Sequence, residues 1–429
     1  MGNTNTKETK RKSRSASKAA APKSPVQKIQ AQQEVQESAK PNVGDSSSQK
    51  PQSTKTVFES SQDTKPTYRI PALVFHENYF LAFCEKRFDG HWDIGKMDLV
   101  LRRGHLGDDG VKWEPEVTLY PENDTDKLMR PMNPVPIVVG EGHIILMFNT
   151  FPKDTPEKVI KATPTPPGKL PLWQLLIKHS TDGGKTWKNY QQLPVGDIFS
   201  GFNSVPSTCA VGPGHGIKLE SGRLVVTGNI AWKGEDNRPF AIVSDDNGDT
   251  WKMGGEINLP ELNGNSVTGN ECQAVEVAHN YVVVNCRTLG THPRIQCYSS
   301  DGCDTFGSPD SPKVMRALKG PKHGCQGSIL GFSAPLVEKE TNDKKYWALL
   351  SNPHSDKREK LSVLLSRDGC KTWPYQPVVL EHKGSAYSDL TGFTQDGQQK
   401  FACLFERIHA NNKHDINFVI FTIDFENLK

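Results

Sequence analysis

Four copies of one eight-residue pattern constrain what this chain can fold into. Each copy has Ser, Asp, Thr and an aromatic residue at its first, third, seventh and eighth positions, with Gly at the fourth or fifth. The copies begin at residues 180, 244, 299 and 366 and read STDGGKTW, SDDNGDTW, SSDGCDTF and SRDGCKTW. Their starts lie 64, 55 and 67 residues apart, which suits one small antiparallel sheet per repeat. The spacing therefore predicts a radial array of sheets instead of one continuous sheet.

Each copy follows a short apolar run that is typical of a strand. These runs cover residues 172–179, 240–243, 294–298 and 361–365. In such a turn the Asp carboxylate can accept backbone N–H groups of its own turn, Gly can adopt a positive φ, and the aromatic ring can wedge between neighbouring sheets. The repeats therefore indicate a fold and carry no chemistry of their own.

The distribution of apolar residues sets the limits of the folded domain. The chain has 429 residues, and its first aromatic residue is Phe58. Residues 1–67 are rich in Ser, Thr, Lys, Gln and Pro, which is the composition of a disordered arm. Residues 68–429 show no long helical periodicity and suffice for six sheets of four short strands. We predict an all-β, six-bladed β-propeller over residues 68–429, preceded by the arm.

The cysteines and the hydropathy pattern indicate an intracellular protein. Nine cysteines are scattered singly with no CxxC motif, which suits free and mostly buried thiols in a reducing compartment. No apolar run reaches membrane-spanning length, and the N-terminus lacks the apolar core of a secretory signal. We therefore expect a cytoplasmic protein with no metal site and no other cofactor.

The first 28 residues combine two membrane-binding signals. They carry a local charge of +7, whereas the whole chain carries +3. The start MGNTNT fits the N-myristoylation pattern, with Gly2 as the acyl acceptor once Met1 is removed. One acyl chain binds a bilayer only marginally, and a polybasic segment adds about 1 kcal/mol per basic residue near an anionic leaflet. We predict peripheral attachment to an anionic membrane surface. The alternatives are a solvated basic tail and a nucleic-acid patch; the arm lacks the interleaved aromatics that nucleic-acid binding would use.

Charged and polar residues interrupt the strand-like segments throughout the domain. Residues 68–73 read YRIPAL, 83–87 read FCEKR and 93–103 read DIGKMDLVLRR; later segments are NECQ at 270–273, VNCR at 284–287, HSDKR at 354–358, GSAYSDL at 384–390 and CLFE at 403–406. Taken singly, each arginine would form a surface salt bridge, and each tyrosine or carboxylate would serve packing or a loop cap. In this order, over essentially all of residues 68–429, they resemble the animal exo-α-sialidases (neuraminidases) of the cytosolic and membrane-associated type.

The resemblance implies three catalytic residues. Asp93 matches the family's acid/base, and its distance to the 98–103 strand favours it over Asp89 in the same loop. Glu271 matches the general base, and Tyr387 matches the nucleophile. The resemblance thus predicts a retaining exo-α-sialidase that works through a covalent glycosyl-tyrosine intermediate, because tyrosine replaces the usual carboxylate nucleophile in sialidases.

The resemblance also implies the residues that bind substrate. The substrate-binding residues that we expect are Arg69, Arg287, Arg358, Glu406, Glu85 and Arg87. Arg69, Arg287 and Arg358 match the family's carboxylate-binding set. Glu406 matches the residue that pairs with Arg69. Guanidinium groups are permanently charged and bind a carboxylate through two parallel hydrogen bonds, which lysine cannot do. A propeller would bring such distant residues to one axial face.

One segment departs from the family pattern. Relatives of the cytosolic type have a pair of tyrosines near the substrate's glycerol tail, whereas residues 227–232 of this chain read TGNIAW. The preference for N-acetyl, N-glycolyl or deaminated sugars is therefore left open. Residues 153–171 contain five prolines and no strand pattern, which predicts a loop near the mouth of the site, with Glu157 in reach of substrate.

Three functions remain to be distinguished. The first is hydrolysis of terminal sialic acids on glycolipids or glycoproteins. The second is binding of sialic acid without turnover, and transfer to another sugar is a variant of the first because both share the covalent intermediate. The third is a scaffold that uses the same turns without binding glycans, and it predicts no converging arginines.

Overall fold

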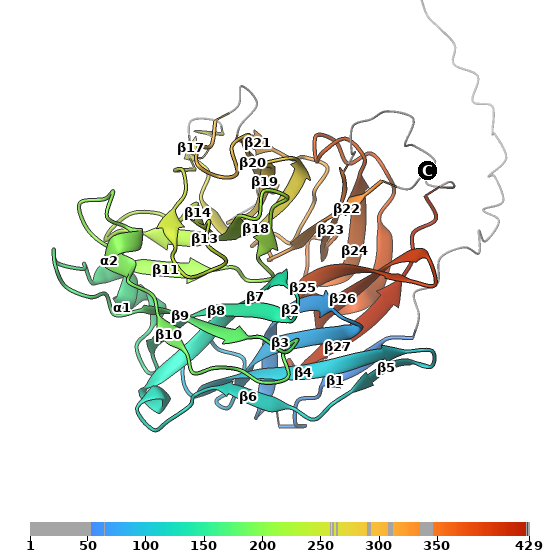
Figure 1. Ribbon diagram of the computed structural model, residues 1–429, viewed down its shortest axis with the longest axis horizontal. Helices are drawn as coiled ribbons and strands as arrows, with labels where there is room; N and C mark the ends of the chain where they lie inside the picture. The colour runs from blue at the N-terminus through green and yellow to red at the C-terminus, as the bar shows by residue number, and fades with distance from the viewer. Residues whose placement is uncertain are drawn as a thin grey trace, which may run out of the picture. The chain divides into compact units, whose positions relative to one another are not determined.

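The computed structural model describes residues 53–425 except for 64, 258, 260, 263–264, 290–292, 308–311 and 335–345, and it also describes residue 427. Gly2 and residues 1–52 of the expected arm lie outside these residues. Within the described residues, the chain forms six small antiparallel sheets, or blades, around a common axis, as Figure 1 shows. The predicted β-propeller is therefore confirmed.

Blades 1 to 3 come from consecutive stretches of the chain. Blade 1 comprises β2 (Thr67–His76), β3 (Tyr79–Arg87), β4 (Met97–Gly107) and β5 (Gly110–Trp113), with β6 (Val117–Tyr120) paired to β4. Blade 2 comprises β7 (Met129–Gly140), β8 (His143–Pro152), β9 (Gln174–Ser180) and β10 (Gln191–Gln192). Blade 3 comprises β11 (Thr208–Val211), β12 (Ile217–Lys218), β13 (Leu224–Ala231), β14 (Arg238–Ser244) and β15 (Lys252–Met253). The helical segments η1 (Asp126–Leu128), α1 (Glu157–Ala162) and α2 (Val195–Ile198) lie in the connections.

Blades 4 to 6 complete the ring, and one long strand is shared between two of them. Blade 4 comprises β18 (Gly269–Ala278), β19 (Tyr281–Thr288), β20 (Ile295–Ser299) and β21 (Lys313–Val314), preceded by the hairpin β16 (Glu261–Leu262) and β17 (Asn265–Ser266). Blade 5 comprises β22 (Ser328–Ser333), β23 (Tyr346–Pro353), β24 (Glu359–Ser366) and the start of β25 (Val378–Gln395). Blade 6 comprises the rest of β25, β26 (Gln398–Ile408), β27 (His414–Phe421) and β1 (Lys55–Phe58).

Blade 6 is closed by β1, the first strand that the structure describes. β1 pairs antiparallel with β27, with Lys55 opposite Phe418, and the Ser60 N–H donates to Asp415 Oδ1 at 2.8 Å. The boundary that we expected between residues 67 and 68 is therefore wrong, because the propeller already begins at β1. Val57 and Phe58 are both 2 % exposed, but two apolar residues in a polar segment are too few to reveal a strand in the sequence.

Hydrophobic clusters fill all six junctions between neighbouring blades. Alternation along the strands explains how one sheet reaches two neighbours, because successive side chains point to opposite faces. On β13, Leu224 and Val226 pack in the cluster shared with blade 2, whereas Val225 packs in the cluster shared with blade 4. In Figure 1, β2, β7, β18 and β25 lie near the middle of the ring. Three of these inner strands carry Arg69, Glu271 and Tyr387, which are described below.

The four repeats form turns of the same construction, which begin at the ends of β9, β14, β20 and β24. In the first, Ser180 Oγ accepts the N–H of Gly184, and Asp182 Oδ1 accepts the N–H of Thr186, both at 2.8 Å. The corresponding Asp–Thr bonds in the other three turns measure 2.9 Å. The predicted role of these aspartates in their own turns is confirmed. We call the four turns the Asp-box turns, residues 180–187, 244–251, 299–306 and 366–373.

The fifth position of each Asp-box turn has a positive φ. It is Gly in two turns, with φ of 78° at Gly184 and 96° at Gly248, but Cys in the other two, with φ of 77° at Cys303 and 66° at Cys370. The turns with Cys at the fifth position have Gly at the fourth, with φ of 68° at both Gly302 and Gly369, so every one of the four turns contains a glycine at positive φ, as expected. All nine cysteines of the chain are unpaired and buried, as expected for a protein that does not depend on disulfides.

Candidate active site

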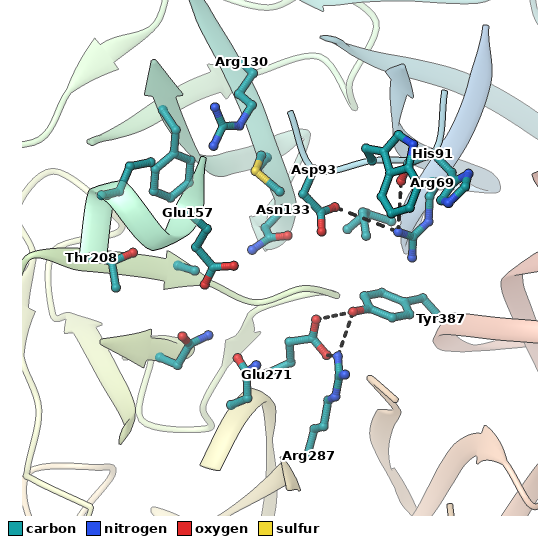
Figure 2. A pocket seen from close by; sticks show the side chains of 18 of the residues that line it. Arg69, His91, Asp93, Arg130, Asn133, Glu157, Thr208, Glu271, Arg287 and Tyr387 are labelled. Atoms are coloured by element: carbon teal, nitrogen blue, oxygen red, sulfur yellow. Dashed lines mark hydrogen bonds and ion pairs between the residues drawn. The ribbon is translucent and has the colours of Figure 1, made fainter. Parts of the chain in front are cut away.

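A cavity of about 380 Å³ opens where inner strands of several blades meet. Side chains from residues far apart in the sequence face it from opposite sides (Figure 2). Its lining comprises Arg69, Ile70, His91, Trp92, Asp93, Arg130, Met132, Asn133, Phe151, Glu157, Ile160, Thr208, Ala210, Asn229, Asn270, Glu271, Arg287, Arg358 and Tyr387. Seven of the residues selected from the sequence are therefore gathered in one cavity: Arg69, Asp93, Glu157, Glu271, Arg287, Arg358 and Tyr387.

Arg69 on β2 is held by a buried carboxylate behind it. Its Nε and Nη2 donate to the two carboxylate oxygens of Glu406 on β26 at 3.1 and 3.3 Å. The Ile70 N–H donates to the same carboxylate at 2.9 Å. Burial alone would raise the pKa of Glu406, but Arg69 outweighs it with help from His414, and the pKa is held well below its usual range. The ionised Glu406 fixes the guanidinium that faces the cavity.

Tyr387 on β25 shares its hydroxyl with two neighbours from blade 4. The phenolic O–H donates to Glu271 Oε1, and Arg287 Nη1 donates to the phenolic oxygen at 2.9 Å (Figure 2). The same Arg287 nitrogen donates to Glu271 Oε2 at 2.7 Å. Burial raises the pKa of Tyr387, the Glu271 carboxylate raises it further, and the nearby arginines oppose both. The phenol is therefore neutral at rest and bonded to a base that can take its proton.

Two further cations lie close to the Tyr387 ring. The guanidinium carbons of Arg69 and Arg358 lie 5.2 and 5.4 Å from the ring centroid. Arg358 precedes β24, and its carbonyl accepts the Ser385 N–H at 2.9 Å. Three arginines thus surround one tyrosine, and the scaffold hypothesis, which predicts no converging arginines, is wrong.

Asp93 lies across the cavity in the loop between β3 and β4, with 59 % of its side chain exposed. Its Oδ1 lies 2.7 Å from Arg87 Nη1 and 3.9 Å from Arg69 Nη1. Partial desolvation inside the cavity would raise the pKa of Asp93, but Arg87 and then Arg69 outweigh that effect, so the pKa is lowered. Asp89 serves the loop instead, because its carboxylate accepts the Lys96 N–H at 2.8 Å.

Glu85 and Arg87 lie beneath the Asp93 loop. Both residues are fully buried, and neither lines the cavity. Glu85 Oε2 accepts Arg87 Nε at 2.9 Å, and Glu85 Oε1 accepts the Asn133 N–H at 2.8 Å. The expectation that these two residues contact substrate is therefore not met. Their position supports Asp93 and the backbone of Asn133, which does line the cavity.

Several lining residues were not identified from the sequence. Thr208 and Asn229 are 4 and 5 % exposed and form one wall with Asn270. Glu157 on α1 lines the cavity as anticipated, although its segment contains a short helix instead of a continuous loop. Arg130 also lines the cavity, but its guanidinium donates to the carbonyls of residues 152, 153 and 155. Asn229 lies in the segment 227–232, whose departure from the family pattern was visible in the sequence, whereas Thr208 and Asn270 look like ordinary residues near strand ends.

Comparison with known proteins identifies the family. A model of the BNR repeat-like domain matches residues 88–399. Mouse Sialidase-2 is 33% identical over 380 residues, which cover 83% of this chain and 92% of that protein. This chain belongs to the sialidase family. The sialidase is therefore a glycoside hydrolase, and the resemblance seen in its sequence is confirmed.

Solved structures of sialidases share the fold. The Hadza microbial sialidase Hz136 superposes with a TM-score of 0.69 at 23% identity, over 88% of this chain and 69% of that chain. Trypanosoma rangeli sialidase in complex with 2,3-difluorosialic acid, described as a covalent intermediate, superposes with a TM-score of 0.65 at 18% identity. This alignment covers 86% of this chain and 58% of the trypanosomal one. At such identities the likeness concerns the propeller itself.

No helix in the described part of the chain is long and apolar enough to cross a membrane. In that same part, no three His, Cys, Asp or Glu side chains gather as a metal ion would require.

Proposed function

We propose that this sialidase is a retaining exo-α-sialidase that releases terminal sialic acids from glycolipids or glycoproteins through a covalent bond to Tyr387. The observation that carries the proposal is the hydrogen-bonded group of Tyr387, Glu271 and Arg287, facing Asp93 across one cavity. Sialic acid bears a carboxylate on its anomeric carbon. A carboxylate nucleophile would meet like-charge repulsion there, whereas a neutral phenol does not.

The arginines bind the substrate carboxylate. Arg69, Arg287 and Arg358 come from three blades and line the same cavity. Their guanidinium groups offer planar, charged donors that match a carboxylate in geometry. Glu406 compensates the charge of Arg69, which limits repulsion among the three cations before substrate arrives.

Tyr387 is the nucleophile and Glu271 is its base. As the phenolic oxygen attacks the anomeric carbon, its proton passes to Glu271 Oε1, to which it is already bonded. The pKa of Tyr387 is raised by burial, so the free phenolate is scarce and proton transfer has to accompany attack. The adjacent positive charges of Arg69 and Arg358 stabilise the negative charge that develops on the ring.

Asp93 is the acid and then the base. It protonates the departing glycosidic oxygen and afterwards deprotonates the water that cleaves the glycosyl-tyrosine bond. In the ligand-free site Arg87 and Arg69 keep the pKa of Asp93 low. The arriving substrate carboxylate neutralises Arg69 and displaces water, and both changes raise the pKa of Asp93. Substrate binding thus favours the protonated form of Asp93 that the first step requires.

Three enzymes and one fluorogenic sialoside test this proposal. We expect Tyr387→Phe to lower kcat by at least about 10³-fold, and Asp93→Ala by about 10²–10⁴-fold, with wild type as reference. Incubation of wild type with 2,3-difluorosialic acid, followed by mass spectrometry of peptides, should attach the sugar to the peptide that contains Tyr387. A Tyr387→Phe variant with wild-type kcat would contradict the proposal. Binding by wild type without turnover would favour a sialic-acid-binding propeller.

Product analysis distinguishes hydrolysis from transfer. NMR of the first released sugar should show the retained α-anomer, because two displacements at one carbon restore its configuration. Added lactose would capture the intermediate in a sialyltransferring enzyme. We expect free sialic acid to remain the main product.

In this proposal the N-terminal arm attaches the enzyme to the membrane, where glycolipid and glycoprotein substrates are found. Gly2 lies outside the described residues, and its acylation is proposed on the sequence pattern and the adjacent charge of +7. Gly2→Ala should move the protein from the membrane fraction to the soluble fraction of cells. An unchanged membrane fraction would contradict an acyl anchor and leave the sialidase proposal untouched.

A further inference from the structure

One buried carboxylate connects five of the six blades at the axis. Asp389, fully buried on β25, accepts the Leu73 N–H from blade 1 and Ser328 Oγ from blade 5, both at 2.8 Å. It accepts the His215 N–H from blade 3 and Gln273 Nε2 from blade 4, both at 3.0 Å. We call Asp389, His215, Gln273 and Ser328 the axial hub. Its members come from sheets that share no backbone ladder with one another, apart from the shared strand β25.

The segment that carries His215 leaves no free space around the carboxylate. A Cβ on Gly214 would lie 2.7 Å from Gln273 Nε2 and 3.2 Å from Asp389 Oδ1. The Gly216 N–H donates to Pro136 O on β7 at 3.0 Å, which attaches blade 2 as well. The glycine-rich run at 212–216, which has no role in the proposed reaction, therefore fills the axis and lets the backbone approach the hub.

The axial hub adjoins the proposed nucleophile and base along two strands. Tyr387 precedes Asp389 by two residues on β25, and Glu271 precedes Gln273 by two residues on β18. These strands belong to different sheets, and side chains bridge them at two levels. One bridge is Gln273 to Asp389 in the hub, and the other is Tyr387 to Glu271 in the cavity. The first bridge therefore constrains the second.

The residue between Tyr387 and Asp389 is held from both sides of its backbone. The Ser388 N–H donates to Gln326 Oε1, and Gln326 Nε2 donates to Ser388 O, both at 3.0 Å. The hydroxyl oxygens of Ser388 and Ser351 lie 2.8 Å apart. The stretch of β25 that presents the tyrosine therefore cannot shift without breaking several buried hydrogen bonds.

We infer that Asp389 is a positioning residue of the active site: by holding β18 and β25 together through Gln273, it sets the separation at which Tyr387 can pass its proton to Glu271. Proton transfer between these groups depends on a short, direct hydrogen bond, so a displacement of well under 1 Å lowers the rate. Binding of the substrate carboxylate depends instead on the three arginines. Arg287 on β19 and Arg358 before β24 lie on segments that contribute no residue to the axial hub. The inference rests on the proposed roles of Tyr387 and Glu271.

Asp389→Asn tests the inference in the full-length enzyme. The amide keeps the shape but turns one acceptor oxygen into a donor that faces N–H and O–H groups. We expect kcat for the fluorogenic sialoside to fall at least about tenfold, with KM changed less than about threefold, per folded molecule. In a Glu271→Gln background, the same change should reduce kcat less than about twofold, because the proton transfer it supports is already lost.

Asp246→Asn is the matched control. Asp246 accepts the Thr250 N–H at 2.9 Å in an Asp-box turn and does not line the cavity. We expect this variant to lose thermal stability and to keep the kcat of wild type. Should Asp389→Asn not fold, Ser328→Ala removes a single donor to the hub and should lower kcat about threefold at constant KM.

Three outcomes separate the inference from the proposed function. A folded Asp389→Asn or Ser328→Ala variant with kcat unchanged, alongside an inactive Tyr387→Phe variant, overturns the inference alone. Equal kcat losses in the wild-type and Glu271→Gln backgrounds also overturn it, because the hub would then act elsewhere. An active Tyr387→Phe variant overturns the proposed function, and the inference falls with it.

Discussion

The Asp-box turns and the centre of the ring use carboxylates in opposite ways: those of the turns are mostly exposed, whereas Asp389 and Glu406 at the centre are fully buried. Asp182 accepts the N–H of Thr186, only four residues away. Asp389 accepts the N–H of Leu73, 316 residues away, and Glu406 accepts Arg69, 337 residues away. The outer turns are therefore satisfied by their own residues, whereas the centre is satisfied only when the whole ring has closed.

The difference shows where this fold tolerates change. A turn that satisfies its own backbone can be altered with local consequences, since its neighbours do not depend on it. A central carboxylate that joins distant strands leaves several buried donors unpaired when it is removed. The same chemical group thus has a small energetic effect at the rim and a large one at the axis.

The largest effect on stability is expected from Glu406→Gln. The change removes the charge that compensates Arg69, which is 7 % exposed, and should lower the free energy of unfolding by about 3–5 kcal/mol. The KM for sialosides should rise, because the unpaired guanidinium loses its fixed position. Urea unfolding and steady-state kinetics measure both effects.

Glu116→Gln is the control for that change. Glu116 accepts Lys86 Nζ at 2.8 Å, but about a quarter of its side chain is exposed. We expect a loss of about 1 kcal/mol or less, since water replaces the lost partner. Equal losses from the two variants would contradict the contrast between the axis and the periphery.

An intermediate effect is expected from Gly248→Ala in the second Asp-box turn. Its Cβ would lie 2.2 Å from Ile145 Cδ1 in the core between blades 2 and 3, at a φ of +96°. We expect a loss of about 1–3 kcal/mol in urea unfolding, because both overpacking and backbone strain oppose the side chain. Gly183→Ala is matched, since its Cβ would meet only Glu77 Oε2 at 3.7 Å, and should cost about 1 kcal/mol. A larger loss at residue 183 would show that packing does not distinguish these positions.

The smallest effect is expected from the titration of Asp182. Burial acts to raise its pKa, but the hydrogen bonds from Thr186 and Ser180 together outweigh it and lower the pKa to about 2. The unfolded value is about 3.9. The folded pKa is the lower one, so the stabilisation is complete above about pH 4 and is lost as the pH falls towards 2. The contribution is below about 1 kcal/mol because the side chain faces solvent. Urea midpoints of wild type and Asp182→Asn should converge between pH 5 and pH 2.5; a constant difference would contradict this account.

The fold was predictable because its signals are local. Each Asp-box turn is complete within eight residues, and the regular spacing of the four copies indicates a ring. The apolar runs before them became β9, β14, β20 and β24, within two residues of the expected bounds. Closure by β1 was not predictable in this way, because the strand that pairs with β1 is β27, which lies at the other end of the described chain.

The site was only partly predictable. The residues that carry charge or a phenol stood out by type and by their order along the chain. Glu85 and Arg87 are charged as well, yet they lie beneath the cavity. Strand register and bulges decide to which face of a sheet a side chain points, and neither can be read from the sequence. Thr208, Asn229 and Asn270 carry no charge and are common residue types in and near strands. Only the structure therefore identifies them as residues that line the cavity.

The pairing of β1 with β27 has a consequence during synthesis. Ser60 and its partner Asp415 are 355 residues apart, so the strand that leaves the ribosome first cannot find its place until nearly the entire polypeptide has been translated. Until then an apolar edge stays open on both the earliest and the latest blade. We therefore expect the nascent chain to be prone to aggregation until β27 has been made. A truncated chain that lacks the final strands should likewise expose an open sheet edge, even where its other blades are intact.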